Sequence, residues 1–146
     1  MIQDLTAMFS VAQPVTASTA STNTVDLKAT GTVYGAAAPI GRDIGKGQTV
    51  PLRCVAVESF NNLTSLTIAI QTDTTAAFSA PVTVFTSPAY SLADLQTGAR
   101  FLLPDSVPVG ARQQFMRLFF TLAGTAPTTG KITAGVTMGN QTNGDL

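Results

Sequence analysis

The sequence lacks histidine and tryptophan altogether, and among its 146 residues it has one cysteine and one glutamate. Without histidine, the commonest general base and metal ligand is absent. The carboxylates are scattered along the chain, so neither an acid–base pair nor a calcium loop has a local signature. The single cysteine, Cys54, has no partner for an internal disulfide, and its apolar neighbours predict a buried side chain. We therefore expect no enzymatic activity, no cofactor and no metal site.

Charge is also scarce. Charged residues make up 11% of the chain and the formal net charge is zero, whereas globular domains have about 25% charged residues. No electrostatic field attracts polyanions, which disfavours a nucleic-acid partner. No apolar run approaches the roughly 18 residues of a membrane span, and the start has no signal-peptide pattern. A neutral chain is weakly protected against self-association, so the composition favours a subunit of an assembly.

What is present favours β-strands. Threonine and serine are abundant, and apolar residues alternate with polar ones in four segments: 49–60, 65–72, 114–124 and 131–138. Turn signals separate these segments from three shorter strand candidates: Asn23–Leu27, Val82–Thr86 and Arg100–Pro104. One helical turn is expected in Ser91–Gly98, with Ser91 as its cap. This pattern predicts an all-β protein: an antiparallel β-sandwich, jelly-roll-like, with seven to eight strands.

The composition gives no boundary between two globular domains. We expect an extended N-terminal arm over residues 1–22, a β-sandwich over 23–139 and a C-terminal tail over 140–146. The arm is apolar at its start and polar at Thr16–Thr24, a pattern typical of a peripheral segment that docks on a partner. We therefore expect that deletion of residues 1–12 leaves a folded domain that has lost its docking contact.

The stretch "GRDIGKG" (Gly41–Gly47) has the glycines and lysine of a phosphate-binding loop, but its spacing is wrong for one. A P-loop needs four residues between its glycines and a serine or threonine after the lysine, whereas Gly47 follows Lys46 here. The segment after it reads as a strand, not as a helix whose amides hold phosphate. We favour a glycine-permitted turn over a small-ligand site, with contact to a protein partner as a third reading.

The aromatic residues leave a second functional class open. A sugar-binding module uses exposed aromatic rings, and the chain offers only Tyr34 and Tyr90 in turn-like segments. Most phenylalanines fall at strand positions and are expected in the core. Phe119 lies on the strand face opposite Phe120, so it is expected either at a subunit contact or in a strand that is buried on both faces.

Four segments in this order resemble the cement, or decoration, proteins of tailed bacteriophages, of the small jelly-roll type. The segments are "MIQDLTAMFSVAQPVTASTASTNTVDL", "GRDIGKG", "IQTDTTAAFSAP" and "QQFMRLFFTLAGTAPTTGKITAGVT". The insertion-like segment "KATGTVYGAAAPIG" (residues 28–41) departs from the resemblance, which leaves its conformation open.

The resemblance implies a structural virion protein that binds the exterior of the phage head and clamps neighbouring subunits of the major capsid protein. It also implies self-association into a homo-oligomer, and assembly in the host cytoplasm. The expected protein-interface residues lie in the arm and in the glycine-rich loop: Ile2, Leu5, Phe9, Arg42, Asp43 and Ile44. The alternative function is a carbohydrate-binding or adhesion β-sandwich on a virion or cell surface.

Overall fold

A computed structural model describes residues 3–32, 34–41, 49–100 and 102–139. These residues form eleven β-strands and one short 3-10 helix. The strands are β1 (Gln3–Pro14), β2 (Thr19–Ala20), β3 (Val25–Asp26), β4 (Thr30–Gly31), β5 (Ile40–Gly41), β6 (Leu52–Glu58), β7 (Leu63–Asp73), β8 (Val82–Thr86), β9 (Tyr90–Ser91), β10 (Phe115–Gly124) and β11 (Lys131–Thr137). The count exceeds the predicted seven to eight because five of the strands contain only two residues.

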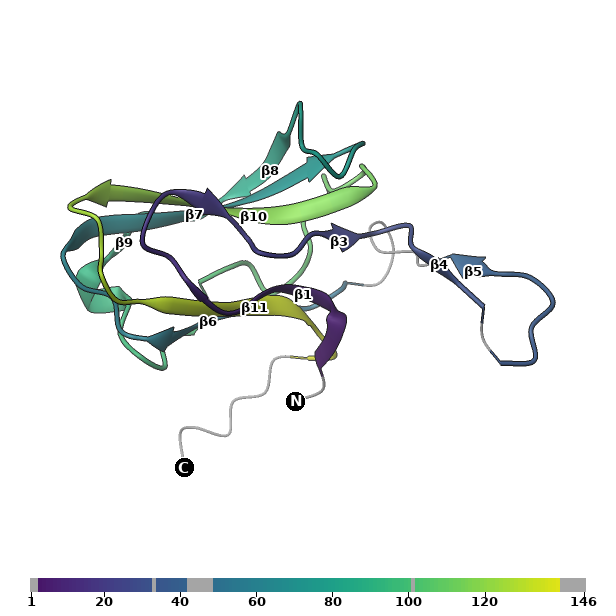
Figure 1. Cartoon of the computed structure of the whole chain (residues 1–146), viewed down its shortest axis with the longest axis horizontal. Helices are drawn as coiled ribbons and strands as arrows, with labels where there is room; N and C mark the ends of the chain where they lie inside the picture. Colours follow the sequence, from purple (N-terminus) through teal and green to yellow (C-terminus); the bar gives the residue numbers. More distant parts are fainter. Residues whose placement is uncertain (1–2, 33, 42–48, 101, 140–146) are drawn as a thin grey trace.

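Two sheets form the body of the molecule, and every strand pair in them is antiparallel. The first sheet has the order β1-β11-β6, and the second has the order β2-β10-β7-β8, with β3 also paired to β10 and β9 to β7. The two sheets lie face to face in Figure 1, with β1, β11 and β6 in the lower layer. The predicted antiparallel β-sandwich is therefore confirmed.

The core lies between the sheets and follows the alternation seen in the sequence. The six-stranded sheet supplies Leu66, Ile68 and Ile70 from β7 and Met116, Leu118 and Phe120 from β10, all fully buried. The three-stranded sheet supplies Ile132, Ala134, Ala56 and Cys54. Burial raises the pKa of the Cys54 thiol far above its usual range, because a thiolate would be desolvated there. Cys54 is thus a small core residue, as predicted.

The N-terminal segment is part of the sandwich, which corrects the predicted arm over residues 1–22. Gln3–Pro14 forms β1 and pairs with β11 along the edge of the three-stranded sheet. Phe9 is fully buried in the core, and its carbonyl oxygen accepts a hydrogen bond from the Asn23 amide (2.9 Å). The arm was predicted from the apolar start of the chain and the polar, low-complexity run Thr16–Thr24, and neither feature has the regular alternation that indicates a strand. Deletion of residues 1–12 would remove most of a strand and a core phenylalanine, so the expected folded remnant is not supported.

Two smaller predictions had different outcomes. The helical turn is confirmed as a 3-10 helix over Leu92–Asp94 with Ser91 at its N-cap, where the Asp94 carboxylate accepts from the Ser91 amide and hydroxyl. The strand predicted at Arg100–Pro104 is absent from the described residues, which show only an isolated bridge between Arg100 and Val55. Residues 98–100 and 102–107 instead cover the outer edge of β6, with hydrogen bonds such as Ala56 N–H to Ala99 O (3.0 Å).

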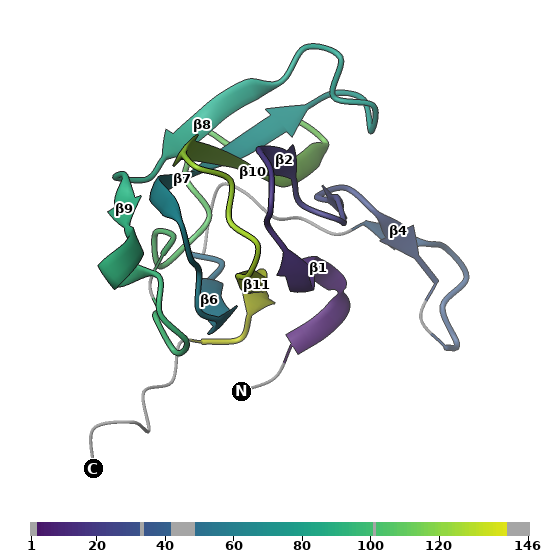
Figure 2. The same cartoon turned by 60° about the vertical axis from the view of Figure 1, so that its left-hand side comes forward.

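A β-hairpin projects from the body, made of β4 and β5. Among the described residues, two pairs form its ladder: Thr30 with Gly41 and Gly31 with Ile40. Figure 1 shows it extending to the right of both sheets, and the rotated view in Figure 2 shows the same projection. This hairpin is the segment whose conformation the sequence left open.

Candidate interaction surfaces

The predicted interface residues do not form one site in the described part of the chain. Leu5 is exposed on β1 (73% exposed), whereas Phe9 is fully buried. The two residues are four apart and would share a face in a regular strand. Register shifts on either side of Met8 break that relation, because each extra residue turns the following side chains to the other face. Phe9 is therefore a core residue and not an interface residue. Ile2, Arg42, Asp43 and Ile44 lie outside the described residues.

The projecting hairpin exposes apolar groups. Between Ala29 and Gly41 the sequence carries no charged residue. Tyr34 is fully exposed, and the Ile40 side chain is 58% exposed. A two-stranded hairpin without a third strand is marginally stable in water by itself. An uncharged, apolar projection that lies off the body is thus a candidate for contact with another surface.

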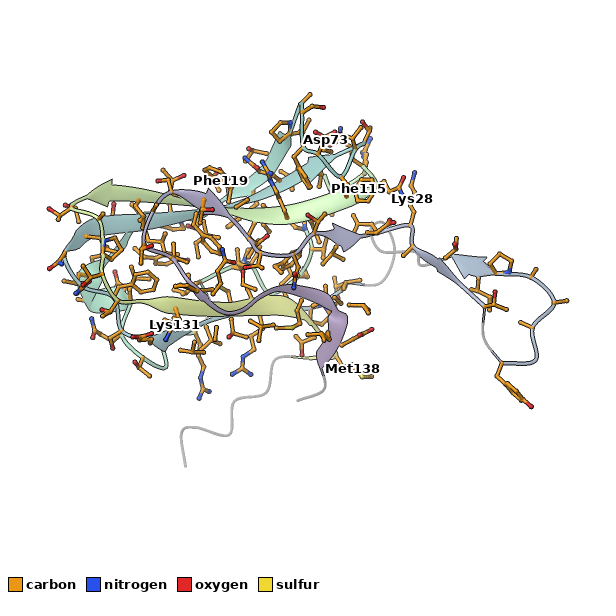
Figure 3. The ribbon with its side chains drawn as sticks, viewed as in Figure 1. Lys28, Asp73, Phe115, Phe119, Lys131 and Met138 are labelled. Carbon is orange, nitrogen blue, oxygen red and sulfur yellow. The ribbon has the colours of Figure 1, made fainter. Side chains whose placement is uncertain are left out.

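A second candidate surface lies on the outer face of the six-stranded sheet. Along β10, Phe115, Arg117 and Phe119 alternate with buried core residues, so all three project from the side away from the core. Each is half-buried. In Figure 3, Phe115 and Phe119 lie on the upper layer, whereas Lys131 lies on the lower, three-stranded layer.

The centre of this face is a group that we call the Arg117 cluster: Gln71, Phe78, Arg117 and Phe119. The Arg117 guanidinium carbon lies 4.2 Å from the centre of the Phe78 ring and 5.8 Å from that of Phe119. Both distances are within the range of a cation–π interaction. The Arg117 Nε–H donates to Gln71 Oε1 on the neighbouring strand (3.0 Å). Two aromatic rings and one amide therefore fix the guanidinium on the sheet.

Asp73 builds the loop that places Phe78 under Arg117. One carboxylate oxygen accepts from the Thr75 amide (3.0 Å), and the other accepts from the Ala80 amide (2.9 Å). These bonds close the chain between the end of β7 and the start of β8. Within the loop, Phe78 adopts a left-handed conformation (φ 50°), which is uncommon for a phenylalanine, and its ring is buried. The carboxylate thus stabilises a backbone shape that positions the ring.

We expect the stability of the protein to depend on Asp73 in a pH-dependent way. The backbone amides of Thr75 and Ala80 lower the pKa of Asp73 in the folded state, because they stabilise its charged form. Since the folded pKa lies below the unfolded value of about 3.9, the stabilisation is complete above about pH 5 and is lost as the pH falls through the folded pKa. Asp73→Asn, measured by urea unfolding, should be less stable than wild type at pH 7, and the difference should shrink below pH 3. A difference that is constant with pH would contradict this assignment.

The remaining polar features of the described residues are structural. Lys131 and Glu58 form an ion pair across β11 and β6 (2.7 Å) with both side chains exposed. Tyr90 is half-buried against the core, and burial raises its pKa. No cluster of three or more histidine, cysteine, aspartate or glutamate side chains that could hold a metal occurs in the described ranges. No helix in that part of the chain is long and apolar enough to span a membrane.

The Arg117 cluster was not predicted from the sequence. Phe119 was expected on the strand face opposite Phe120, but nothing in the order of residues indicated that Phe78 would reach the same face. The available signal was the repeat Phe115, Arg117, Phe119, because large side chains on the solvent face of a sheet are candidates for contact. Phe78 joins them only through the fold of its loop.

The fold and its surfaces define a small all-β sandwich protein with a projecting hairpin. Residues 9–136 of the sequence match the Bbp16 family. The matched range runs from within β1 to β11 and covers most of the chain, so the chain belongs to the Bbp16 family. No curated protein matches the sequence.

Proposed function

We propose that this chain is a structural virion protein, a cement or decoration protein of a tailed phage. It binds the exterior of the head, contacts neighbouring subunits of the major capsid protein, and associates with copies of itself. The resemblance of four ordered segments to such proteins supports this proposal. Membership in the Bbp16 family is consistent with it.

The observation that carries the proposal is the β4–β5 hairpin. Its exposed Tyr34 and Ile40 make no contribution to the sandwich core, and its uncharged sequence fits an apolar docking surface. An element that projects from a rigid sandwich can reach a neighbouring subunit while the body remains in place. Many copies on a repeating lattice add such modest contacts into a large total.

The stabilising effect on the head follows from mass action. A protein that binds the assembled shell but not the separated subunits favours the shell, by an amount that grows with its free concentration. No catalytic group is required for this function. Heads that carry the protein should therefore resist heating better than heads that lack it.

A reconstitution experiment tests both the proposed function and the role of the hairpin in docking. Purified protein is added to heads that lack it, and bound protein is measured by co-sedimentation, with head disruption followed by light scattering during heating. Wild type should bind in a fixed ratio to the major capsid protein and raise the disruption temperature. The variant Tyr34→Ser with Ile40→Ser should keep its unfolding free energy within about 0.5 kcal/mol, because both sites are exposed, but should bind far less.

Val109→Ser is the matched control, because Val109 is another exposed apolar residue (72% exposed) on a different loop. It should bind as wild type does. If wild type does not associate with heads at all, the proposed function is wrong. If the double variant binds as well as Val109→Ser, the hairpin is not a docking element, although the function itself would stand.

A further inference from the structure

We infer that the Arg117 cluster is a docking site for a carboxylate on a different protein. This inference rests on the proposed function, in which that protein is the major capsid protein of the shell. The site lies on the outer face of the six-stranded sheet, and it is separate from the hairpin in the chain. Its recognition chemistry is one carboxylate held by Arg117 within an aromatic frame.

The Arg117 side chain is fixed in one conformation before any partner binds. Its Nε–H is used by Gln71, and the ring of Phe78 lies against its guanidinium. In the part of the chain that the structure describes, Arg117 forms no ion pair with a carboxylate. The terminal nitrogens of a guanidinium carry four further N–H donors, which match a carboxylate in a bidentate geometry. Since the side chain is already fixed, little conformational entropy remains to be lost on binding.

The surroundings of Arg117 indicate that the partner supplies both charge and apolar surface. Several neighbouring positions on the outer face carry uncharged residues: Ala69 and Thr67 on β7, Ala20 on β2, and Phe115 and Phe119 on β10. The exceptions are Asp73 and Asp26, which lie opposite Phe115 and accept hydrogen bonds from within the chain. An arginine flanked by aromatic rings and small residues is the composition typical of an interface hot spot. A nucleic acid would require several cations, whereas the chain has no net positive charge.

Two copies of the chain that pair through this same face would not supply a carboxylate to Arg117. The carboxylates nearest in register are Asp73 and Asp26, which flank Phe115 on the two adjacent strands. Both oxygens of Asp73 accept loop hydrogen bonds, and its side chain is buried. Asp26 accepts from the Lys28 amide and from the Gln114 side chain. Pairing two copies through this face would therefore bring two arginines together without a free carboxylate for either. A two-fold pairing through this face is therefore disfavoured, and the partner that we infer is a different protein with a carboxylate to offer.

The experiment measures the affinity of variants for heads that lack the protein. Arg117→Gln should weaken binding about 30-fold or more, as expected when one member of a desolvated charge pair is removed. Arg117→Lys, which retains the charge but loses the planar fork, should weaken binding about 10-fold. Arg100→Gln is the matched control, because Arg100 is an exposed arginine beside β6 of the opposite sheet, and it should bind as wild type does. Raising the salt concentration should weaken wild type more than Arg117→Gln.

The outcomes separate the two proposals. If wild type does not bind heads, the proposed function fails. If wild type binds and Arg117→Gln binds within threefold of it, the inference is wrong while the function stands. If Arg117→Gln changes the sedimentation coefficient of the free protein from that of wild type while both remain folded, the face joins copies of the chain and the inference is also wrong. If Arg117→Gln has no cooperative unfolding transition, the affinity of Arg117→Lys for heads is used instead. The inference is then wrong if Arg117→Lys binds within threefold of wild type.

Discussion

Phe9→Ala is expected to destabilise the protein by about 3–5 kcal/mol, the usual cost of truncating a buried phenylalanine. Phe9 is fully buried among the core residues of both sheets. The loss is a large fraction of the roughly 5–15 kcal/mol that stabilises a typical domain. Urea unfolding followed by circular dichroism would measure it, and the midpoint should fall with little change in slope.

Leu5→Ala is the control within the same strand. Leu5 is 73% exposed, so its truncation should change the free energy of unfolding by less than about 0.5 kcal/mol. If Phe9→Ala costs no more than Leu5→Ala, then β1 is not an integral strand and the N-terminal segment is the docked arm that its sequence suggested. The pair of variants thus separates the two descriptions of the N-terminus.

Gly130→Ala is expected to cost about 2–5 kcal/mol, from two separate effects. Gly130 has a φ of +128°, which side-chain-bearing residues rarely adopt, and a methyl group there would meet the ring of Phe60, at 2.6 Å from Cε1 and closer still to Cδ1. The backbone strain accounts for about 1–2 kcal/mol. The collision accounts for about 1–3 kcal/mol, because Phe60 is itself buried and has little room to move.

Gly98→Ala isolates the backbone effect, since Gly98 has a φ of +92° but open space where the methyl group would lie. It should cost only about 1–2 kcal/mol. Combining Gly130→Ala with Phe60→Leu should give a smaller loss than the sum of the two single variants, because the smaller side chain relieves the collision. Simple additivity in thermal or urea unfolding would show that Phe60 is not the obstacle.

Individual elements show why some predictions from the sequence succeeded and others did not. Val82–Thr86 was predicted with its observed bounds, because a short run of β-branched and aromatic residues between turn signals has few alternatives. Arg100–Pro104 was also predicted as a strand, but its described residues show only an isolated bridge between Arg100 and Val55. The composition of a segment indicates whether it can form a strand. Whether the strand forms depends on a neighbouring strand edge that is free to pair with it.

The interaction surfaces were likewise predicted from the sequence only in part. Subunit contacts were predicted at the apolar start of the chain and at the glycine-rich loop, but Phe9 is a core residue. The hairpin could not be derived from its sequence because its few backbone pairs do not impose a strong period. The Arg117 cluster joins residues from β7, β10 and the loop after Asp73, and such a meeting requires the register of two strands.

The sequence by itself determined the all-β class, the inward faces of β6, β7, β10 and β11, and the burial of Cys54. Those features depend on residue type and period-two alternation, which are local properties of the chain. Only the tertiary structure decided that Gln3–Pro14 is an edge strand, that β4 and β5 project as a hairpin, and that Phe78 supports Arg117. Those features depend on bulges, strand register and contacts between distant segments, and the free energies that set them arise only when the two sheets pack together.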